Sequence, residues 1–209
     1  MCGIVGYNGA RPVTDFLLDA LELLEYRGYD SAGLATINAE TGRTKLRKCA
    51  GRVADLRKVC ENDKKQATCG IGHTRWATHG GVSDENAHPH RQGNVLLVHN
   101  GIVENYEELR DHFMLSKDLK SETDTEVVAG VLNRYYDGDP HKAIAQTVKH
   151  LKGTFALVII FDDIPDVIYA IRNVSPIVAA RTEDGTMLAS DVAALGSHAT
   201  EYMVVPEYQ

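Results

Sequence analysis

The sequence predicts an α+β fold in which mixed sheets are stacked on each other and helices lie outside them. Predicted strands and helices come in blocks along the chain, and they do not alternate strictly as in a doubly wound parallel sheet. The segment after residue 152 is rich in predicted strands, and hydrophobic residues make up 44% of the chain, as in ordinary globular proteins. We find no repeat, low-complexity tract or linker, and therefore expect one domain over residues 1–209.

The elements of the first half follow from apolar spacing and turn residues. An apolar run after Cys2 predicts a buried strand, and apolar residues at helical spacing follow Pro12, which suits a first helical turn. Two glycines and an Asp-Ser pair make residues 27–33 a predicted loop. The predicted elements are strand 2–7, helix 12–26, hairpin strands 34–38 and 44–49, and surface helix 52–63.

The second half begins with a short strand at residues 69–75 that runs into a loop reaching to about Gln92. A buried strand follows over residues 94–103, with a turn predicted at its Asn100-Gly101 pair. A helix then starts with a T-x-x-E capping box at Thr123. The remaining predicted elements are helices 104–114, 123–136 and 140–151, strands 154–161, 166–172, 177–181 and 187–190, a short helix near 191–195, and strand 201–205.

Composition and charge argue against several classes of function. The net charge is -7 and basic residues do not cluster, so neither nucleic acid nor anionic membrane is an expected partner. The longest apolar run, 156–161, is far too short to span a bilayer, and the N-terminus lacks the features of a signal peptide. We therefore expect a cytoplasmic protein whose cysteines, at positions 2, 49, 60 and 69, are free thiols.

Cys2 is the first candidate for chemistry. By position alone it is a buried strand cysteine, because free cysteine is among the most buried residue types. When aminopeptidases remove Met1, however, Cys2 carries both a thiol and a free α-amine. That amine, with a pKa of about 7.7–8.0, is partly neutral at physiological pH and can accept the thiol proton, as in nucleophiles activated by an N-terminal amine.

Three further stretches offer what such a nucleophile needs. Asn100-Gly101 supplies a side-chain amide and a backbone N–H for a developing oxyanion. Arg75, in HTRWATHG, offers a guanidinium fork for a carboxylate, and Trp76 beside it would shape a pocket. Asp124, in the first turn of its helix, would pair with a substrate ammonium. Each stretch alone also fits ordinary structure, namely a hairpin turn, a surface loop and a residue that complements the helix dipole.

A group of histidines raises the alternative of a metal site. They do not have the tight, repeated spacing of Cys or His pairs that structural zinc requires, so we expect no metal. The histidines are His73, His79, His88, His90 and His99.

Several long motifs, taken together, resemble one family. CGIVGY, LEYRGYDSAGLA, HTRWATHG, NAHPH, VHNGIVEN and SETDTEV are similar to the glutaminase (class II glutamine amidotransferase) domain of glucosamine-6-phosphate synthases, also called glutamine–fructose-6-phosphate aminotransferases (isomerizing). The motifs occur in the right order over essentially the whole chain. The resemblance implies an N-terminal nucleophile (Ntn) hydrolase fold, a four-layer α/β/β/α sandwich of two stacked antiparallel sheets, and an enzyme that needs no metal and no organic cofactor.

The resemblance also implies the reaction and its catalytic residues. Cys2 would attack the side-chain amide of L-glutamine, with its own α-amine as the base and with Asn100 and Gly101 as the oxyanion hole. Ammonia would leave, and water would then release glutamate from a thioester on Cys2. Arg27 matches a residue near the cysteine and its covering loop. Activity would require the removal of Met1.

The substrate side of the site is implied in the same way. Arg75 and Asp124 would hold the carboxylate and the amine of L-glutamine, with Thr78 and His79 nearby. Trp76 is similar to a residue at the entrance of the family's ammonia passage.

The chain stops where the sugar-isomerase domains of this family would begin. We therefore expect glutaminase activity here, with a sugar-isomerase domain in cis or in trans using the ammonia to convert fructose 6-phosphate to glucosamine 6-phosphate. The full-length enzyme would be a homo-oligomer. Two alternatives stay open. The first is another class II amidotransferase, such as one feeding purine synthesis, although the motif EYRGYDSAG argues against it. The second is a regulatory glutamine-binding module.

Overall fold

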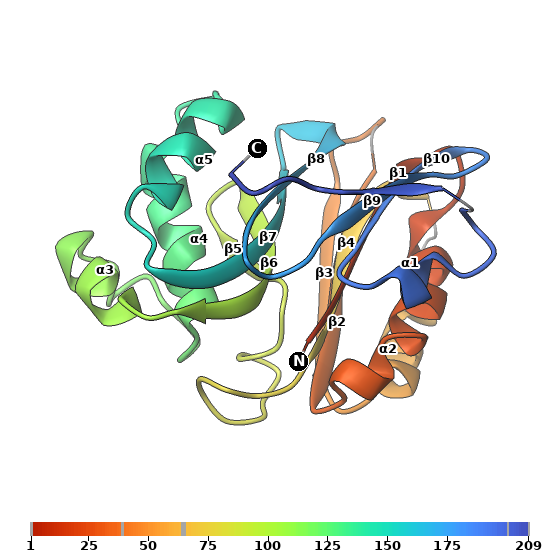
Figure 1. The fold of residues 1–209 in the computed structure, drawn as a ribbon. Coiled ribbons are helices and arrows are strands. Elements are labelled where there is room, and N and C mark those ends of the chain that lie inside the picture. Colours follow the sequence, from red (N-terminus) through yellow and green to blue (C-terminus); the bar gives the residue numbers. More distant parts are fainter. Residues whose placement is uncertain (1, 39, 64–65, 200, 209) are drawn as a thin grey trace.

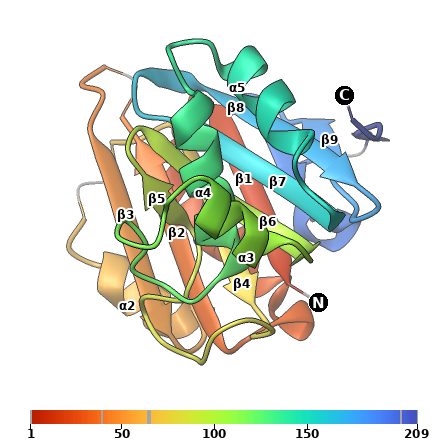
Figure 2. The same ribbon diagram turned by 90° about the vertical axis from the view of Figure 1, so that its left-hand side faces the viewer.

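A computed structural model describes residues 2–38, 40–63, 66–199 and 201–208, and these form four layers (Figure 1). Two sheets are stacked in the middle, with helices on both outer faces. One outer layer contains α1 (Val13–Glu22) and α2 (Val53–Cys60). Figure 2 shows the other outer layer in front of its sheet, with α3 (Tyr106–His112), α4 (Asp124–Tyr135) and α5 (Pro140–Val148). The predicted α/β/β/α sandwich is confirmed.

The larger sheet has seven strands, and all of its recorded pairings are antiparallel. Its strand order is β11-β9-β10-β1-β4-β2-β3, so the N-terminal strand is central. The strands are β1 (Gly3–Gly9), β2 (Ser31–Ile37), β3 (Thr44–Ala50), β4 (Cys69–Arg75), β9 (Val178–Arg181), β10 (Gly185–Ala189) and β11 (Tyr202–Val204). Two 3-10 turns, η1 (Glu25–Arg27) and η2 (Val192–Leu195), lie beside the site described below.

The smaller sheet has four strands in the order β5-β6-β7-β8, again all antiparallel. They are β5 (His90–Gln92), β6 (Val95–Val103), β7 (Gly153–Phe161) and β8 (Ile164–Asn173). The sheets are therefore antiparallel, as the family resemblance implied, and not mixed.

The uninterrupted apolar run in β7 reflects burial on both faces of its sheet. Phe155 and Leu157 belong to the core under α3, α4 and α5, whereas Ala156 and Val158 belong to the core between the two sheets. A third core packs α1 and α2 against the larger sheet. Each sheet thus has an apolar layer on both sides, which explains why these strands lack simple apolar–polar alternation.

Two predictions near the site were wrong. The loop predicted for residues 27–33 ends early, because Ser31 already begins β2 and pairs with both Ala50 and Arg75. The turn predicted at Asn100-Gly101 does not form, because β6 continues to Val103 and Gly101 pairs with Phe155 of β7. Pairing with neighbouring strands, which local turn propensity does not include, decides both places.

The start of α4 corrects a third prediction. Thr123 is the N-cap and its hydroxyl accepts the backbone N–H of Glu126 at 3.2 Å, as the capping box requires. The Glu126 carboxylate, however, accepts the backbone N–H groups of Lys120 and Ser121 at 2.9 and 2.6 Å, and no return bond to the Thr123 N–H is made among the described residues. The cap therefore ties the preceding loop to the helix and fixes Asp124 at the first helical position.

Two shorter observations complete the fold. The segment 90–92, expected within a loop, is strand β5 and pairs with β6. Within the described ranges, no helix is both long and apolar enough to cross a membrane.

Candidate active site

Cys2 is held at the start of the central strand of the larger sheet. The strand that follows it, β1, pairs with β10 on one side and with β4 on the other. Ile4 also exchanges hydrogen bonds with Ser190, whose hydroxyl accepts the Ile4 N–H at 2.9 Å and whose own N–H donates to the Ile4 carbonyl at 3.0 Å. This pairing keeps a half-buried residue near the chain end in a defined position.

Two side chains hold the carbonyl oxygen of Cys2. Arg27 donates to it from Nε at 3.1 Å, and Asn100 donates from Nδ2 at 3.0 Å. Arg27 is in turn fixed by Asp191, whose carboxylate lies 2.6 Å from Nη1 and accepts the Tyr26 hydroxyl at 2.7 Å. The structure thus places Arg27 and Asn100 directly against Cys2, on its carbonyl.

The sulfur of Cys2 lies against the backbone of Trp76. The Trp76 N–H donates to Sγ at 3.2 Å, and the Trp76 carbonyl lies 3.6 Å from the same sulfur. Burial raises the pKa of the Cys2 thiol, while the Trp76 N–H and the charge of Arg75 lower it and offset only part of that effect. A thiol in this environment stays protonated at neutral pH, so its use as a nucleophile requires a base.

Gly101 takes a backbone conformation that only glycine adopts without strain. Its φ is 132°, and a Cβ at this position would overlap the carbonyl oxygen of Thr154 on the neighbouring strand. The residue is nevertheless exposed toward the pocket that contains Cys2. The requirement for glycine therefore comes from the sheet, and not from a hairpin turn.

Arg75, at the end of β4, organises the loop that follows it. Its Nη1 donates to the carbonyl of Gly81 at 3.1 Å, and its Nη2 donates to the carbonyls of Gly80 at 3.2 Å and His79. Among the described residues Nε has no partner, and Nη1 uses one of its two hydrogens, so N–H groups remain for a ligand. The guanidinium is buried, with 3% of the residue exposed.

Asp124 is buried at the first position of α4, where the helix dipole favours a negative charge. Its Oδ2 accepts the backbone N–H of Val103 at 2.9 Å and lies 3.8 Å from Nδ1 of His99. That same Nδ1 lies 3.1 Å from the Thr125 hydroxyl. Burial lowers the pKa of His99, although Asp124 opposes the shift.

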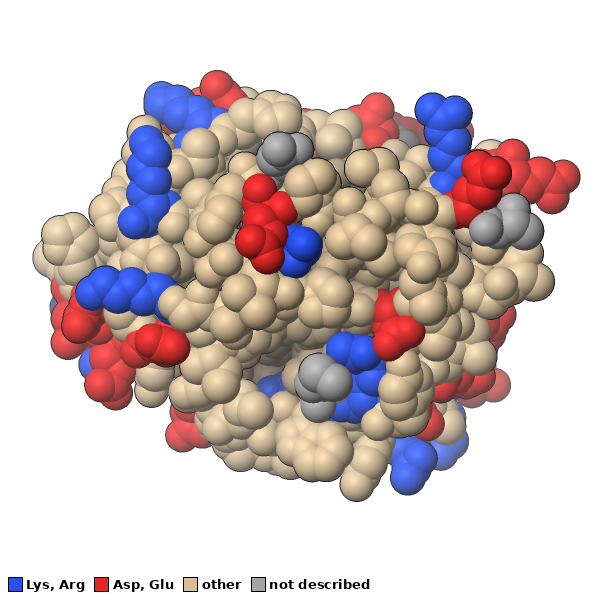
Figure 3. Space-filling view, viewed as in Figure 1, with Lys and Arg blue, Asp and Glu red and all other residues tan. Residues whose placement is uncertain are grey.

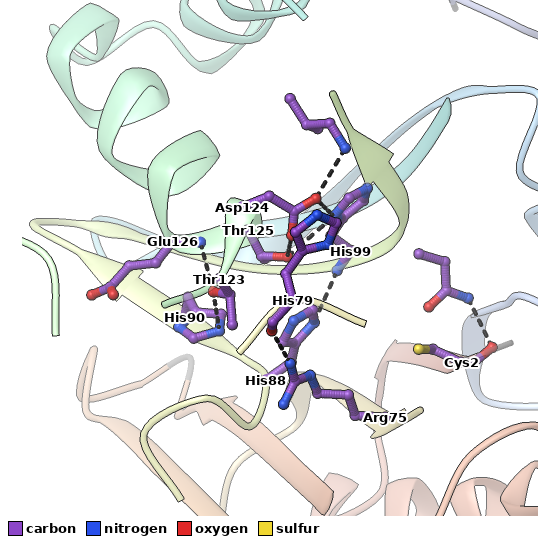
Figure 4. A network of polar contacts seen from close by, with 12 residues as sticks. Cys2, Arg75, His79, His88, His90, His99, Thr123, Asp124, Thr125 and Glu126 are labelled. Atoms are coloured by element: carbon purple, nitrogen blue, oxygen red, sulfur yellow. Dashed lines mark hydrogen bonds and ion pairs between the residues drawn. The ribbon is translucent and has the colours of Figure 1, made fainter. Parts of the chain in front are cut away.

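Several of these groups line one small pocket, whereas Arg27 and Asn100 contact Cys2 without lining it. Figure 4 shows the Cys2 sulfur facing the side on which Arg75, His79 and Asp124 gather. The expected site residues that line the pocket are Cys2, Arg75, Trp76, Thr78, His79, Gly101 and Asp124.

The remaining lining and the surrounding surface are also informative. Trp76 is half-exposed, at 49%, and its ring meets that of Tyr29 edge-on at 6.1 Å. The His79 ring packs edge-on against Tyr106 at 5.4 Å. In the space-filling view of Figure 3, most of the face is uncharged, and Lys and Arg side chains are scattered over it instead of forming one patch.

Sequence reasoning missed two supporting residues. His73, considered only as a metal ligand, contacts Asn100, and Asp191 anchors Arg27. His73 was detectable in principle, because it lies two positions before Arg75 on the same face of a strand. Asp191 was not detectable from the sequence, because it is distant from Arg27 along the chain and only sheet pairing brings the two together. In the part of the chain that the structure describes, no group of three or more His, Cys, Asp and Glu side chains is arranged to hold a metal ion.

The prediction that concerns Met1 lies outside the described residues. Cys2 itself is described.

Comparison with known families agrees with this arrangement. A family model described as "Glutamine amidotransferase domain" matches residues 73–197, which is more than half of the chain. The chain belongs to the glutamine amidotransferase family. The match begins within β4, includes Arg75, and reaches beyond Asp191. The resemblance seen in the sequence motifs is thereby confirmed.

Relatives within the family extend the match to nearly the whole chain. The chain is 46% identical over 210 residues to a glutamine–fructose-6-phosphate aminotransferase (isomerizing) of Symbiobacterium thermophilum, and this covers 99% of the chain and 34% of that relative. It is 42% identical over 211 residues to the protein of the same name from Clostridium acetobutylicum, with the same coverage of both chains. The amidotransferase chain therefore spans about a third of the length of these curated relatives.

A solved structure supports the fold alone. The glutamine phosphoribosylpyrophosphate amidotransferase of B. subtilis, complexed with ADP and GMP, superimposes with a TM-score of 0.82 at 23% identity, covering 99% of this chain and 46% of that one. An amidotransferase of the Ntn type thus shares the arrangement of strands and helices described above.

Proposed function

We propose that this domain hydrolyses the side-chain amide of L-glutamine to glutamate and ammonia through a thioester on Cys2. The observation that carries the proposal is the position of the Cys2 sulfur at a small pocket that also contains a guanidinium and a buried carboxylate. Arg75 and Asp124 offer opposite charges for the two charged groups of an α-amino acid. Thr78 and His79 line the same pocket and would contact the bound substrate, while Trp76 would border the exit for ammonia.

The proposed first stage forms the thioester. Once Met1 is removed, the α-amine of Cys2 takes the thiol proton, and the thiolate attacks the side-chain carbonyl carbon of glutamine. This base is needed because burial raises the pKa of the thiol. The carbonyl oxygen becomes an oxyanion, which the Asn100 amide and the Gly101 N–H stabilise. When the tetrahedral intermediate collapses, the C–N bond breaks, and the α-amine returns its proton to the leaving ammonia.

The second stage releases glutamate. The neutral α-amine takes a proton from water, and the hydroxide attacks the thioester carbonyl at the same oxyanion site. The C–S bond breaks, and the thiolate regains a proton. No metal or organic cofactor takes part in either stage.

We further propose that the ammonia serves amination and isomerisation of fructose 6-phosphate to glucosamine 6-phosphate in a longer enzyme, with a sugar-isomerase domain in cis or in trans. The relatives at 41–46% identity are named glutamine–fructose-6-phosphate aminotransferases, which supports this partner over one in purine synthesis. The phosphoribosylpyrophosphate amidotransferase structure matches at 23% identity and supports only the fold. A homo-oligomeric full-length enzyme remains a prediction.

The experiment compares glutamate release by the chain with a free Cys2 amine and by its Cys2→Ala variant. Intact mass must first establish that the N-terminal residue is Cys2. We expect turnover in the parent protein and none above background in the variant. Equal rates in the two proteins would overturn the proposal, and glutamine binding without turnover would favour a regulatory module instead.

A further inference from the structure

His73 belongs to β4, and its side chain lies between the two sheets. It contacts Asn100, which in turn contacts Cys2. It is fully buried, and its ring stacks on His88 with centroids 4.1 Å apart. Its Nε2 lies 3.1 Å from the carbonyl oxygen of His99 and 3.1 Å from Oδ1 of Asn100. One ring nitrogen is thus shared between a backbone oxygen and the side chain of a proposed oxyanion donor.

The backbone contacts determine which atoms carry hydrogen. The His99 carbonyl can only accept, so Nε2 of His73 must be protonated, and the Asn100 atom facing it must be oxygen. At its other end, the Asn100 amide meets the carbonyl oxygen of Cys2 at 3.0 Å, so that end must be nitrogen. Two carbonyl groups, one on each side, therefore fix both the imidazole tautomer and the orientation of the amide.

The charge state of the ring agrees with this assignment. Burial lowers the pKa of His73 to about 3, so the ring is neutral at physiological pH. In the described part of the chain, Nδ1 has no hydrogen-bond partner, as expected for the unprotonated nitrogen of a ring that donates only from Nε2.

An amide nitrogen carries two hydrogens, and Cys2 uses one of them. We propose that His73 is a positioning residue that holds the Asn100 amide with its second N–H toward the reacting carbonyl of the substrate. Without the Nε2–H donor, Oδ1 loses its partner and only the hydrogen bond to the Cys2 carbonyl orients the amide, so the second N–H is held less firmly toward the oxyanion. This proposal rests on the proposed glutaminase function, because it assigns Asn100 to the oxyanion.

The test compares two substitutions of the same residue in protein that starts at Cys2. His73→Phe keeps a ring against His88 but removes the donor, whereas His73→Gln restores an N–H near the position of Nε2. Losing an oxyanion donor costs about 10²–10³ in rate, so we expect misorientation in His73→Phe to lower kcat about 10- to 100-fold with little change in KM. His73→Gln should recover most of kcat. Equal losses in both variants, or a change in KM alone, would overturn the proposal.

A double-mutant cycle separates positioning from packing. If His73 acts through Asn100, His73→Phe should lower kcat in the parent protein but leave it unchanged in the Asn100→Ala background. A packing role predicts the same loss in both backgrounds, and that result would overturn the proposal. The affinity for glutamate, which needs no oxyanion, should stay unchanged in His73→Phe, while the affinity for a glutamate γ-aldehyde that adds to the thiol should fall about as much as kcat.

A measurement on the unsubstituted protein keeps the proposal testable if a variant does not fold. Nitrogen-15 spectra should show His73 as the neutral Nε2–H tautomer at pH 7. A ring protonated on Nδ1 would contradict the assignment. The parent and Cys2→Ala rates distinguish a failure of this proposal, in which glutamine is still hydrolysed, from a failure of the glutaminase function itself.

Discussion

The Arg27–Asp191 pair leads to a prediction about how the nucleophile is held. Asp191→Asn keeps the shape of the side chain but removes its charge from the contacts with Arg27 and Tyr26. Because Arg27 donates to the Cys2 carbonyl, the effect should pass from Asp191 to Cys2, the proposed nucleophile. The chain offers a matched control in Asp184, which pairs with Arg11 at 2.6 Å and accepts the Tyr7 hydroxyl at 3.0 Å, but contacts nothing near Cys2 among the described residues.

The geometry sets the size of the effect. Hydrogen bonds to charged groups contribute about 1.5–3 kcal/mol when well shielded. The Arg27 and Asp191 side chains are 9% and 25% exposed, so we expect Asp191→Asn to lower the free energy of unfolding by about 1–2 kcal/mol. Asp184→Asn should destabilise less, since its pair is more exposed, at 34% and 27%. Misplacing a reacting group by about 1 Å costs up to about 10² in rate, so a looser Cys2 should lose about tenfold in kcat.

The assay measures glutamate release under saturating glutamine, together with urea unfolding of each variant. We expect both substitutions to lower the unfolding midpoint and only Asp191→Asn to lower kcat. The reasoning would be refuted if Asp184→Asn lowered kcat as much, or if Asp191→Asn left it at the parental value.

Three further predictions follow from the site and its surroundings. Gly101→Ala should lower kcat and should lower the free energy of unfolding by at least about 1–2 kcal/mol for the positive φ alone. An unchanged melting temperature would contradict the sheet-based requirement for glycine. Arg75→Lys should raise the KM for glutamine more than tenfold, because one ammonium cannot hold three loop carbonyls and a ligand carboxylate together, and a KM within twofold of the parent would argue against this role. Acid should destabilise the fold, because burial lowers the pKa of the buried histidines while the unfolded chain binds their protons from about pH 6.5 downward. The stability that these histidines contribute should therefore be fully present above about pH 6.5 and fall as the pH decreases, for His73 by up to about 1.4 kcal/mol per pH unit down to about pH 3. A urea midpoint unchanged between pH 7 and pH 5 would exclude this linkage. The histidines concerned are His73, His88, His90 and His99.

Much of the layer order was accessible from sequence, because apolar periodicity reports burial directly. The continuous run in β7 and the helical spacing in α1 are examples, since each pattern persists over several turns or strand positions. The proposed site residues Cys2 and Arg75 were accessible for another reason. They carry unusual chemistry in long motifs, and these motifs could be recognised before any contact was known.

The remaining features depend on contacts between distant segments. The Asn100-Gly101 pair has strong turn propensity, but pairing with β7 keeps it inside a strand. Glu126 has the right spacing for a capping box, yet its carboxylate binds backbone groups of the loop before the cap. The partners of Arg27 and Asn100, namely Asp191 and His73, are joined to them only by the stacking and pairing of strands.

The central position of β1 has a consequence for how the domain is made. The residues that touch or support Cys2 come from four separate parts of the chain, around residues 27, 76, 100 and 190, and Asp124 from a fifth part lines the same pocket. During synthesis Cys2 emerges well before the strand β10 and the Ser190 and Asp191 contacts. The nascent chain therefore cannot assemble the site until nearly the whole domain has left the ribosome. Such long-range pairing is also slow to form, so the appearance of activity would report completion of folding and not the synthesis of the cysteine.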